Sequence, residues 1–228
     1  MVSKKKSQGN QNLEAVESAL SRTEMFIEDN SKLFSYLIIG VIVIAGAFIG
    51  VKKLIIAPKQ TEASSQMFMA EQYFEQDSFN LALNGDGNYL GFLDIMDEYK
   101  ITKAAKLANF YAGISYLQLG QFNEAIEYLS KFSSKDEMIM PIATGAIGDA
   151  HAELDNMDKA IEFYLKAANI RKNEFTSPIY LLKAGELLET QDKAQEALDT
   201  YNKIKDDYPE SNEARQIPKY IERAKQKI

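Results

Sequence analysis

The stretch Gly113–Phe132 reads GISYLQLGQFNEAIEYLSKF, and its pattern of small and large residues returns twice later in the chain. The recurring positions are Gly113, Tyr116, Gly120, Phe122, Ala125, Ile126, Leu129 and Phe132; then Gly148, His151, Asp155, Met157, Ala160, Ile161, Tyr164 and Ala167; then Gly185, Leu188, Asp192, Ala194, Ala197, Leu198, Tyr201 and Ile204. The second copy follows the first after thirty-five positions, and the third follows the second after thirty-seven. This period predicts paired antiparallel helices stacked side by side, and hence an all-α fold.

Small residues mark the places where the two helices of each predicted pair cross. They are Gly113, Gly148 and Gly185 on the first helices, with Ala125, Ala160 and Ala197 on the second. The large residues Tyr116, Leu129, Tyr164 and Tyr201 are expected to fill the space between neighbouring pairs. His151 takes the place of Tyr116 in the next copy, which favours a packing role over a catalytic one.

The repeated pattern resembles the tetratricopeptide repeat, in three copies that cover residues 104–210. Tyr208-Pro209 ends the last copy as the family's helix-stopping proline does, whereas the two copies before it carry Glu137 and Lys172 at that point. The resemblance implies a helical-repeat domain, or α-solenoid, that binds other proteins. It does not specify the partner, because these repeats serve many partners.

A degenerate first copy and a final helix are expected at the two ends of the array. Ala70, Tyr73 and Phe79 precede their counterparts by forty-three positions, but Gly91 precedes Ala125 by only thirty-four. An insert of about nine residues near 79–88 reconciles the two spacings, and the alternation of apolar residues there favours an extended excursion. Residues 211–228 are expected to form a capping helix that covers the last pair.

A run without any charged residue, from Leu33 to Val51, lies near the N-terminus between Lys32 and Lys52. As a helix it reaches roughly 28 Å at about 1.5 Å per residue, enough for a hydrocarbon core of about 30 Å. A buried core helix is the alternative, but such helices usually contain about 10–14 apolar residues. A cleaved signal peptide is disfavoured because the run begins only at Leu33 and no small-x-small site follows it.

The run divides the chain into three segments, which are a cytoplasmic tail at 1–32, an anchor with an interfacial segment at 33–57, and an extracytoplasmic repeat domain at 58–228. Within the tail, residues 11–29 are expected to form an amphipathic helix that lies on the membrane or docks onto a membrane partner. Lysine and arginine counts beside the anchor leave its orientation open. We expect the N-terminus inside, because the opposite arrangement would translocate Lys4–Lys6 without a signal peptide.

Composition excludes several classes of function. Residues 1–59 carry a net charge of +3 and residues 60–228 a net charge of −10, so the domain would repel the phosphates of nucleic acid. The chain has no Cys and a single His, which excludes thiolate chemistry and a histidine metal cluster within one copy. No nucleophile with a matching base and no cofactor motif stands out, so neither an enzyme nor a cofactor is expected.

Taken whole, the layout resembles that of the ancillary subunit of the bacterial SecYEG translocon (the YfgM-like family), through the anchor and the repeat glycines and alanines named above. The resemblance implies a single-pass protein of the inner membrane with a cytoplasmic N-terminus and a periplasmic domain. Its implied partners are membrane subunits of the translocon, periplasmic chaperones or prolyl isomerases, and exported polypeptides. A scaffold for another envelope-assembly or secretion machine is the alternative.

Two candidate contact surfaces follow from these expectations. In the repeat domain, exposed positions on the first helix of each pair would line a concave groove for the partner, namely Met67, Phe74, Phe110, Ile114, Leu117, Asp149, Glu153 and Glu186. In the anchor, Gly46 and Gly50 form a Gly-x-x-x-Gly pattern that would let a second transmembrane helix approach closely.

Overall fold

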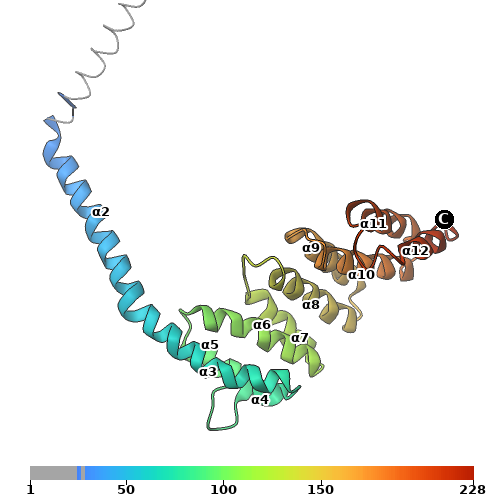
Figure 1. Ribbon diagram of the computed structural model, residues 1–228, viewed down its shortest axis with the longest axis horizontal. Coiled ribbons are helices and arrows are strands. Elements are labelled where there is room, and N and C mark those ends of the chain that lie inside the picture. The colour runs from blue at the N-terminus through green and yellow to red at the C-terminus, as the bar shows by residue number, and fades with distance from the viewer. Residues whose placement is uncertain (1–24, 27–28) are drawn as a thin grey trace, which may run out of the picture. The chain divides into compact units, whose positions relative to one another are not determined.

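The computed structural model describes residues 25–26 and 29–228 of the chain, in two compact units that meet between Ala57 and Pro58. All regular structure among these residues is helical (Figure 1). This confirms the predicted all-α fold of a long apolar helix followed by helical repeats. The predicted tail helix over 11–29 falls almost entirely outside the described residues.

The first unit contains the helix α2 (Ser31–Val51) and a five-residue π-helical segment η1 (Lys52–Ile56). No residue of α2 is buried, although the helix is apolar over most of its length. The helical stretch Ser31–Glu75 includes a segment that is long and apolar enough to cross a membrane, and none of that segment is buried within the protein. A single-pass membrane anchor is compatible with these properties.

The second unit consists of helices joined by short turns (Figure 1). They are α3 (Ala57–Glu75), α4 (Phe79–Asn84), α5 (Phe92–Glu98), α6 (Lys103–Gln118), α7 (Phe122–Lys131), α8 (Ile139–Glu153), α9 (Met157–Ile170), α10 (Thr176–Thr190), α11 (Ala194–Asp207) and α12 (Ile217–Lys225). Each helix from α5 to α12 packs against the next, so the array is built from neighbour contacts.

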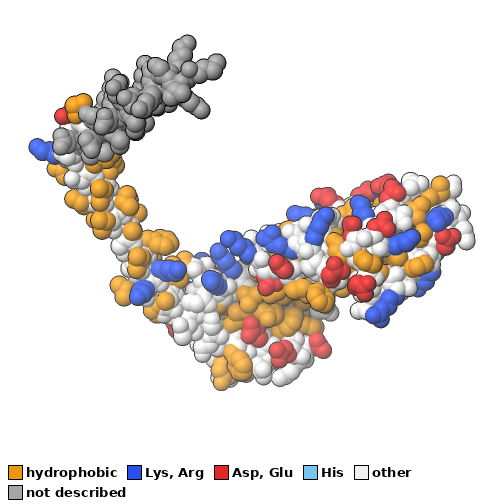
Figure 2. Space-filling model, turned by 45° about the horizontal axis from the view of Figure 1, so that its top comes forward, with side chains coloured by type: hydrophobic (Ala, Val, Ile, Leu, Met, Phe, Trp, Pro, Cys, Tyr) orange, Lys and Arg blue, Asp and Glu red, His pale blue; other side chains and the backbone are white. Residues whose placement is uncertain are grey.

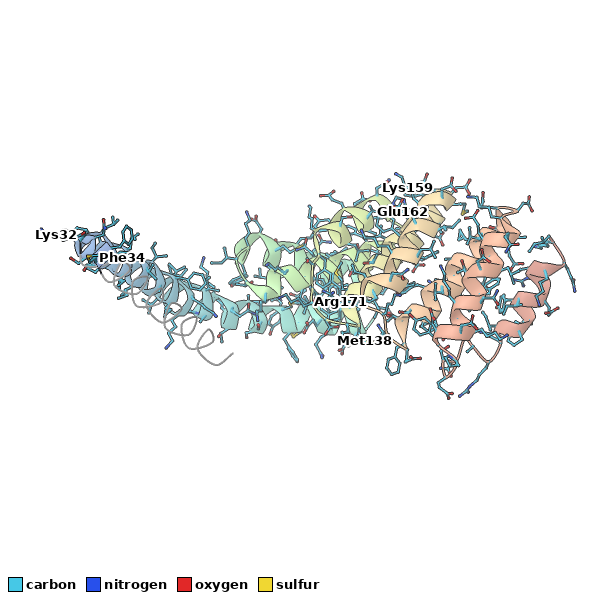
Figure 3. The ribbon with its side chains drawn as sticks, turned by 90° about the horizontal axis from the view of Figure 1, so that it is seen from above. Lys32, Phe34, Met138, Lys159, Glu162 and Arg171 are labelled. Carbon is cyan, nitrogen blue, oxygen red and sulfur yellow. The ribbon has the colours of Figure 1, made fainter. Side chains whose placement is uncertain are left out.

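The pair α8 and α9 illustrates the antiparallel arrangement. Figure 3 places Met138, just before α8, on the same side as Arg171, just after α9. Lys159 and Glu162, from the first turns of α9, lie on the opposite side. The first helix of the pair therefore begins, and the second ends, along one edge of the domain.

Glycines lie where the two helices of each pair cross, as the sequence predicts. A Cβ atom at Gly113 would lie 2.4 Å from Leu129 Cγ, and one at Gly185 would lie 2.2 Å from Tyr201 Cε1. At Gly148 the same atom would meet the ring of Tyr164 at 2.7 Å. Ala125, Ala160 and Ala197, on the second helices, have no exposed surface. Bulk is thus excluded at each crossing, as predicted, but Leu129, Tyr164 and Tyr201 fill the crossing of their own pair and not only the space between neighbouring pairs.

The turns inside the four pairs share one backbone geometry. Two residues after the end of each first helix stands a residue in the left-handed region. These residues are Asp77, Gly120, Asp155 and Asp192, with φ of 55°, 73°, 59° and 55°. The N–H of the following residue donates to the carbonyl five residues earlier, at 2.8 to 3.0 Å. This is the Schellman ending of a helix, which satisfies carbonyls that have no partner within the helix.

The first pair departs from the extended excursion that the sequence suggested. Phe79–Asn84 form α4, a helix of six residues with Ala82 and Leu83 buried, so the strand-like expectation was wrong. The loop that follows is ordered by Asp86, whose carboxylate accepts hydrogen bonds from the N–H groups of Asn88 and Tyr89 at 2.9 and 2.8 Å. The inserted residues therefore complete a short helix and a hydrogen-bonded turn.

The last helix, α12, begins at Ile217, well after Ser211. Pro218 stands in its first turn, where the missing N–H is tolerated, and this fixes the start of the helix. Ser211 instead closes a local turn, with its hydroxyl accepting from the Ala214 N–H at 3.2 Å. Ile217 and Ala224 have no exposed surface and Ile221 is 6% exposed, so α12 covers the last pair.

We predict that Gly185→Ala destabilises the domain. The added methyl group would overlap the ring of Tyr201, which is fully buried and cannot move aside. The free energy of unfolding should fall by about 1–2 kcal/mol, which is the cost of overpacking less the gain in helix propensity. Denaturant unfolding of the detergent-solubilised chain measures the change.

Gly120→Asp is the matched control. Nothing lies within 4 Å of a Cβ at Gly120, and the other three turns carry Asp at the same place with the same backbone geometry. Its stability should fall by less than that of Gly185→Ala, because only the strain of the left-handed backbone at Gly120 has to be met. Equal losses in the two variants would contradict a special role for the crossing.

Candidate protein-interaction surface

The first helices of the pairs, α3, α6, α8 and α10, carry the eight residues that the sequence placed in a groove. Met67 is 3% exposed and belongs to the core between α3 and α6, so it offers no contact surface. Phe74, Phe110, Ile114, Leu117 and Asp149 are partly buried, whereas Glu153 and Glu186 are exposed. Contact with a partner at these seven residues remains a prediction.

The two aromatic residues of the predicted groove belong to a cluster that joins the first two pairs. The ring of Phe74 packs edge-on against Tyr111 at 5.1 Å and against Phe92 at 6.4 Å. The ring of Phe110 packs against Tyr111 and Phe132, each at 5.5 Å. Both side chains therefore stabilise the fold and present only part of their surface, a position typical of anchor residues that are already held in place.

Apolar side chains gather on one face of the domain. Figure 2 shows hydrophobic side chains over its middle, with Asp and Glu side chains at the margins. Between α3 and α6 lies a hollow of about 200 Å³, whose lining includes Ser64, Glu71 and Leu107. Leu107 and its α6 neighbours Ile114 and Leu117 also pack against the core between α7 and α8.

The acidic residues of the predicted groove differ in whether they have partners. Asp149 accepts hydrogen bonds from Lys183 Nζ and from the Tyr164 hydroxyl, each at 2.7 Å. Burial, together with this hydrogen bond to Asp149, raises the pKa of Tyr164. Burial, together with the nearby carboxylate of Glu186, raises the pKa of Tyr220 in α12. Glu153 makes no ion pair with any described residue, so its charge is the one most available to a partner.

Glu189, in α10, is the most buried carboxylate of this surface. It is 4% exposed and accepts hydrogen bonds from the Tyr201 hydroxyl at 2.7 Å and from Arg223 Nε at 3.0 Å. The hydrogen bond from Arg223 holds the pKa of Glu189 below its ordinary value. Arg223 follows Glu189 by about one repeat length. Opposite charges at that spacing are the sequence feature from which this contact could have been predicted.

The glycines of the anchor are open to their surroundings. A Cβ atom at Gly46 or Gly50 would meet nothing within 4 Å. The described part of the chain therefore leaves this face of α2 uncovered, and a second helix could approach it. Packing of a partner helix at these glycines stays a prediction.

The stacked helix pairs are similar in sequence to those of a known protein family. Residues 110–175 and 180–211 match the tetratricopeptide repeat family. The helix pairs in these two ranges are therefore similar to tetratricopeptide repeats. No curated protein matches the chain. The matched ranges run from α6 to α11, whereas α3, α4 and α5 lie outside them.

Tetratricopeptide repeats indicate a protein–protein interaction module, and proteins built from them are generally non-enzymatic scaffolds. Among the described residues there is no group of three or more His, Asp or Glu side chains placed to hold a metal ion. The first helices of the repeats instead present outward-facing residues. These residues lie away from the glycine contacts at which the two helices of a pair cross.

His151 takes the packing role that its position in the repeat predicts. It is 8% exposed, and its ring lies 5.4 Å from the ring of Phe163, just as Tyr116 stacks on Tyr128 in the preceding tetratricopeptide repeat at 5.2 Å. Its Nδ1 atom is buried and has no hydrogen-bond partner. Burial, assisted by the nearby charge of Lys159, lowers the pKa of His151 from its ordinary value of 6.5.

The lowered pKa of His151 predicts a loss of stability in mild acid. The unfolded chain takes up a proton at a higher pH than the folded domain does, so stability falls as the pH drops through 6.5 and levels off below the pKa of the folded state. Unfolding measured at about pH 7.5 and about pH 5 should show this loss. His151→Tyr, which copies the preceding repeat, should reduce it.

The chain has no other histidine, and the comparison with His151→Tyr separates its contribution from that of carboxyls such as Glu71, whose pKa burial raises. His151→Tyr should still unfold cooperatively at the higher pH, because a tyrosine occupies the same position in α6. An identical drop in stability for wild type and variant would show that His151 does not carry the effect.

Proposed function

We propose that this protein is a membrane-anchored adaptor of the bacterial inner membrane that serves as an accessory subunit of the Sec translocon. Its N-terminus would be cytoplasmic and its repeat domain periplasmic. There the domain would hold a periplasmic chaperone or prolyl isomerase close to the channel from which exported polypeptides emerge. The same layout could serve another envelope-assembly or secretion machine, and the experiment below separates the two.

The observation that carries this proposal is the placement of an interaction module directly after an anchor. The apolar helix α2 ends at Val51 and has no buried residue, and the repeat domain begins at Pro58. Such a short connection confines the domain to the neighbourhood of the membrane, where a membrane partner and its client proteins meet. Effective concentration then favours binding without a large interface.

Isolation of the full-length protein in mild detergent, followed by mass spectrometry, tests the proposed partners. Translocon subunits and a prolyl isomerase or chaperone should be recovered together. The variant Gly46→Leu with Gly50→Leu should insert normally but recover less of the membrane partner, because the larger side chains would block close helix packing. Recovery of secretion-machine components alone would reject the translocon and support the alternative.

Topology has its own test. External protease added to spheroplasts should degrade residues 58–228 and leave the tail protected. A repeat domain that resists protease in intact spheroplasts but not after lysis would contradict the periplasmic assignment. This outcome is independent of which partner is recovered.

We predict that Phe110→Ala strongly weakens binding of the periplasmic partner. Phe110 is partly exposed and is fixed by Tyr111 and Phe132, and truncating a pre-ordered aromatic anchor costs about 2 kcal/mol or more in binding. Calorimetry with the recovered partner measures the change. Phe175→Ala is the matched control, because Phe175 is 70% exposed and lies outside the predicted groove.

Glu153→Lys should have a smaller effect of a different kind. Because Glu153 is exposed and makes no ion pair with a described residue, reversing its charge should modestly weaken binding and reduce its dependence on salt.

Circular dichroism should first show that the Phe110→Ala domain is folded, since Phe110 also supports the core. Unchanged affinity in a folded Phe110→Ala protein would move the binding site away from the first helices.

A further inference from the structure

The corner of the domain where the chain arrives from the anchor is rich in lysine. Its first residues, 58–61, contain Lys59 and no acidic residue. The first turn of α3 is tied to the start of α6, because the Lys103 N–H donates to Gln60 Oε1 at 2.6 Å. This contact brings the start of α6, with Lys103 and Lys106, to the same edge of the domain, and Lys100 lies just before this helix.

The connection to the anchor limits how far this corner can lie from the bilayer. Only the short segment 52–57 separates Val51, the last residue of α2, from Pro58, the first residue of the domain. Even fully extended, at about 3.5 Å per residue, it keeps Pro58 within roughly 25 Å of the end of α2. The basic corner is thus the part of the domain nearest to α2 along the chain, and the inference that it meets lipid rests on the proposed role of α2 as a membrane anchor.

A hollow of about 490 Å³ opens beside this corner, between α5, α6 and α7. Leu93, Met96 and Tyr128 give it an apolar lining, and Lys100, Lys106 and Lys131 stand among its lining residues. Ile101, which is 54% exposed, follows Lys100 directly. An apolar side chain flanked by lysines is the arrangement by which surface segments enter the head-group region of a membrane.

The lysines of this hollow are available to an anion. Lys100 pairs with Asp97, which also lines the hollow, and Lys131 pairs with Glu127, but these exposed ion pairs contribute little in water. Lys103 and Lys106 make no ion pair with any described residue. Figure 2 shows Lys and Arg side chains gathered along one edge of the domain, although the domain as a whole is acidic. The local charge therefore opposes the overall charge.

We propose that this corner, made of Lys100, Ile101, Lys103, Lys106 and the hollow beside them, binds the phosphate head groups of anionic phospholipids in the membrane that holds the anchor. The lysines supply the attraction to phosphate, and Ile101 with the lining of the hollow contacts the glycerol and upper acyl region. Lipid contact here needs no protein partner, and it holds the domain at the membrane surface.

The full-length chain reconstituted into nanodiscs tests this site. Because the chain has no Cys, an environment-sensitive dye on Ile101→Cys reports from one position. Its fluorescence should rise in discs that contain phosphatidylglycerol and stay low in discs of phosphatidylcholine alone. In a background of Lys103→Gln and Lys106→Gln, the ratio of docked to undocked domain should fall by about 30-fold, since each lysine contributes about a factor of five.

Lys203→Gln with Lys205→Gln, in the exposed part of α11, is the matched control and should leave the response unchanged. Soluble glycerol 3-phosphate added to phosphatidylcholine discs separates the two sources of phosphate and should give no response. An equal response in both kinds of disc, an equal response to soluble phosphate, or equal effects of the two lysine pairs would overturn the proposal.

Discussion

The contact between a glycine on one helix and a large side chain on the next is the constraint on which this fold depends. At Gly113, Gly148 and Gly185 the space that a Cβ would need is filled by Leu129, Tyr164 and Tyr201. The two axes of a pair can therefore approach closely, and the large side chain is locked against backbone instead of against a mobile side chain. Three crossings of the same kind give three pairs of the same shape, which is what allows them to stack.

Stacking adds a second set of contacts, which are polar and separated by one repeat. Lys183 reaches back to Asp149 and Arg223 reaches back to Glu189, each across about one repeat length. The inner carboxylate is the more buried member of the second pair, and Arg223 compensates the cost of burying it. The final helix α12 is held by this contact as well as by its apolar face. Asp149 and Glu189, on the first helices, thus hold neighbouring parts of the array together, and this use limits their availability to a partner protein.

Sequence alone predicted the features that depend on residue size at fixed spacing. The crossings and the packing role of His151 follow from that spacing. The short helix α4 was missed because Phe79, Leu81 and Leu83 alternate over too few residues to distinguish a helix from a strand. The pairing of Asp149 and the burial of Met67 could not be predicted, because the twist between neighbouring pairs decides which side chains meet.

Two surfaces of this domain use different physical forces, and this difference suits an adaptor. The face of the first helices offers partly buried aromatic side chains with few free charges, so burial of apolar area would dominate binding there. The corner around Lys103 and Lys106 offers two lysines that make no ion pair with a described residue, and their attraction for lipid decreases with salt and with distance from the membrane. Because the two forces respond to different conditions, the domain can remain at the lipid surface while its partner on the repeat face exchanges.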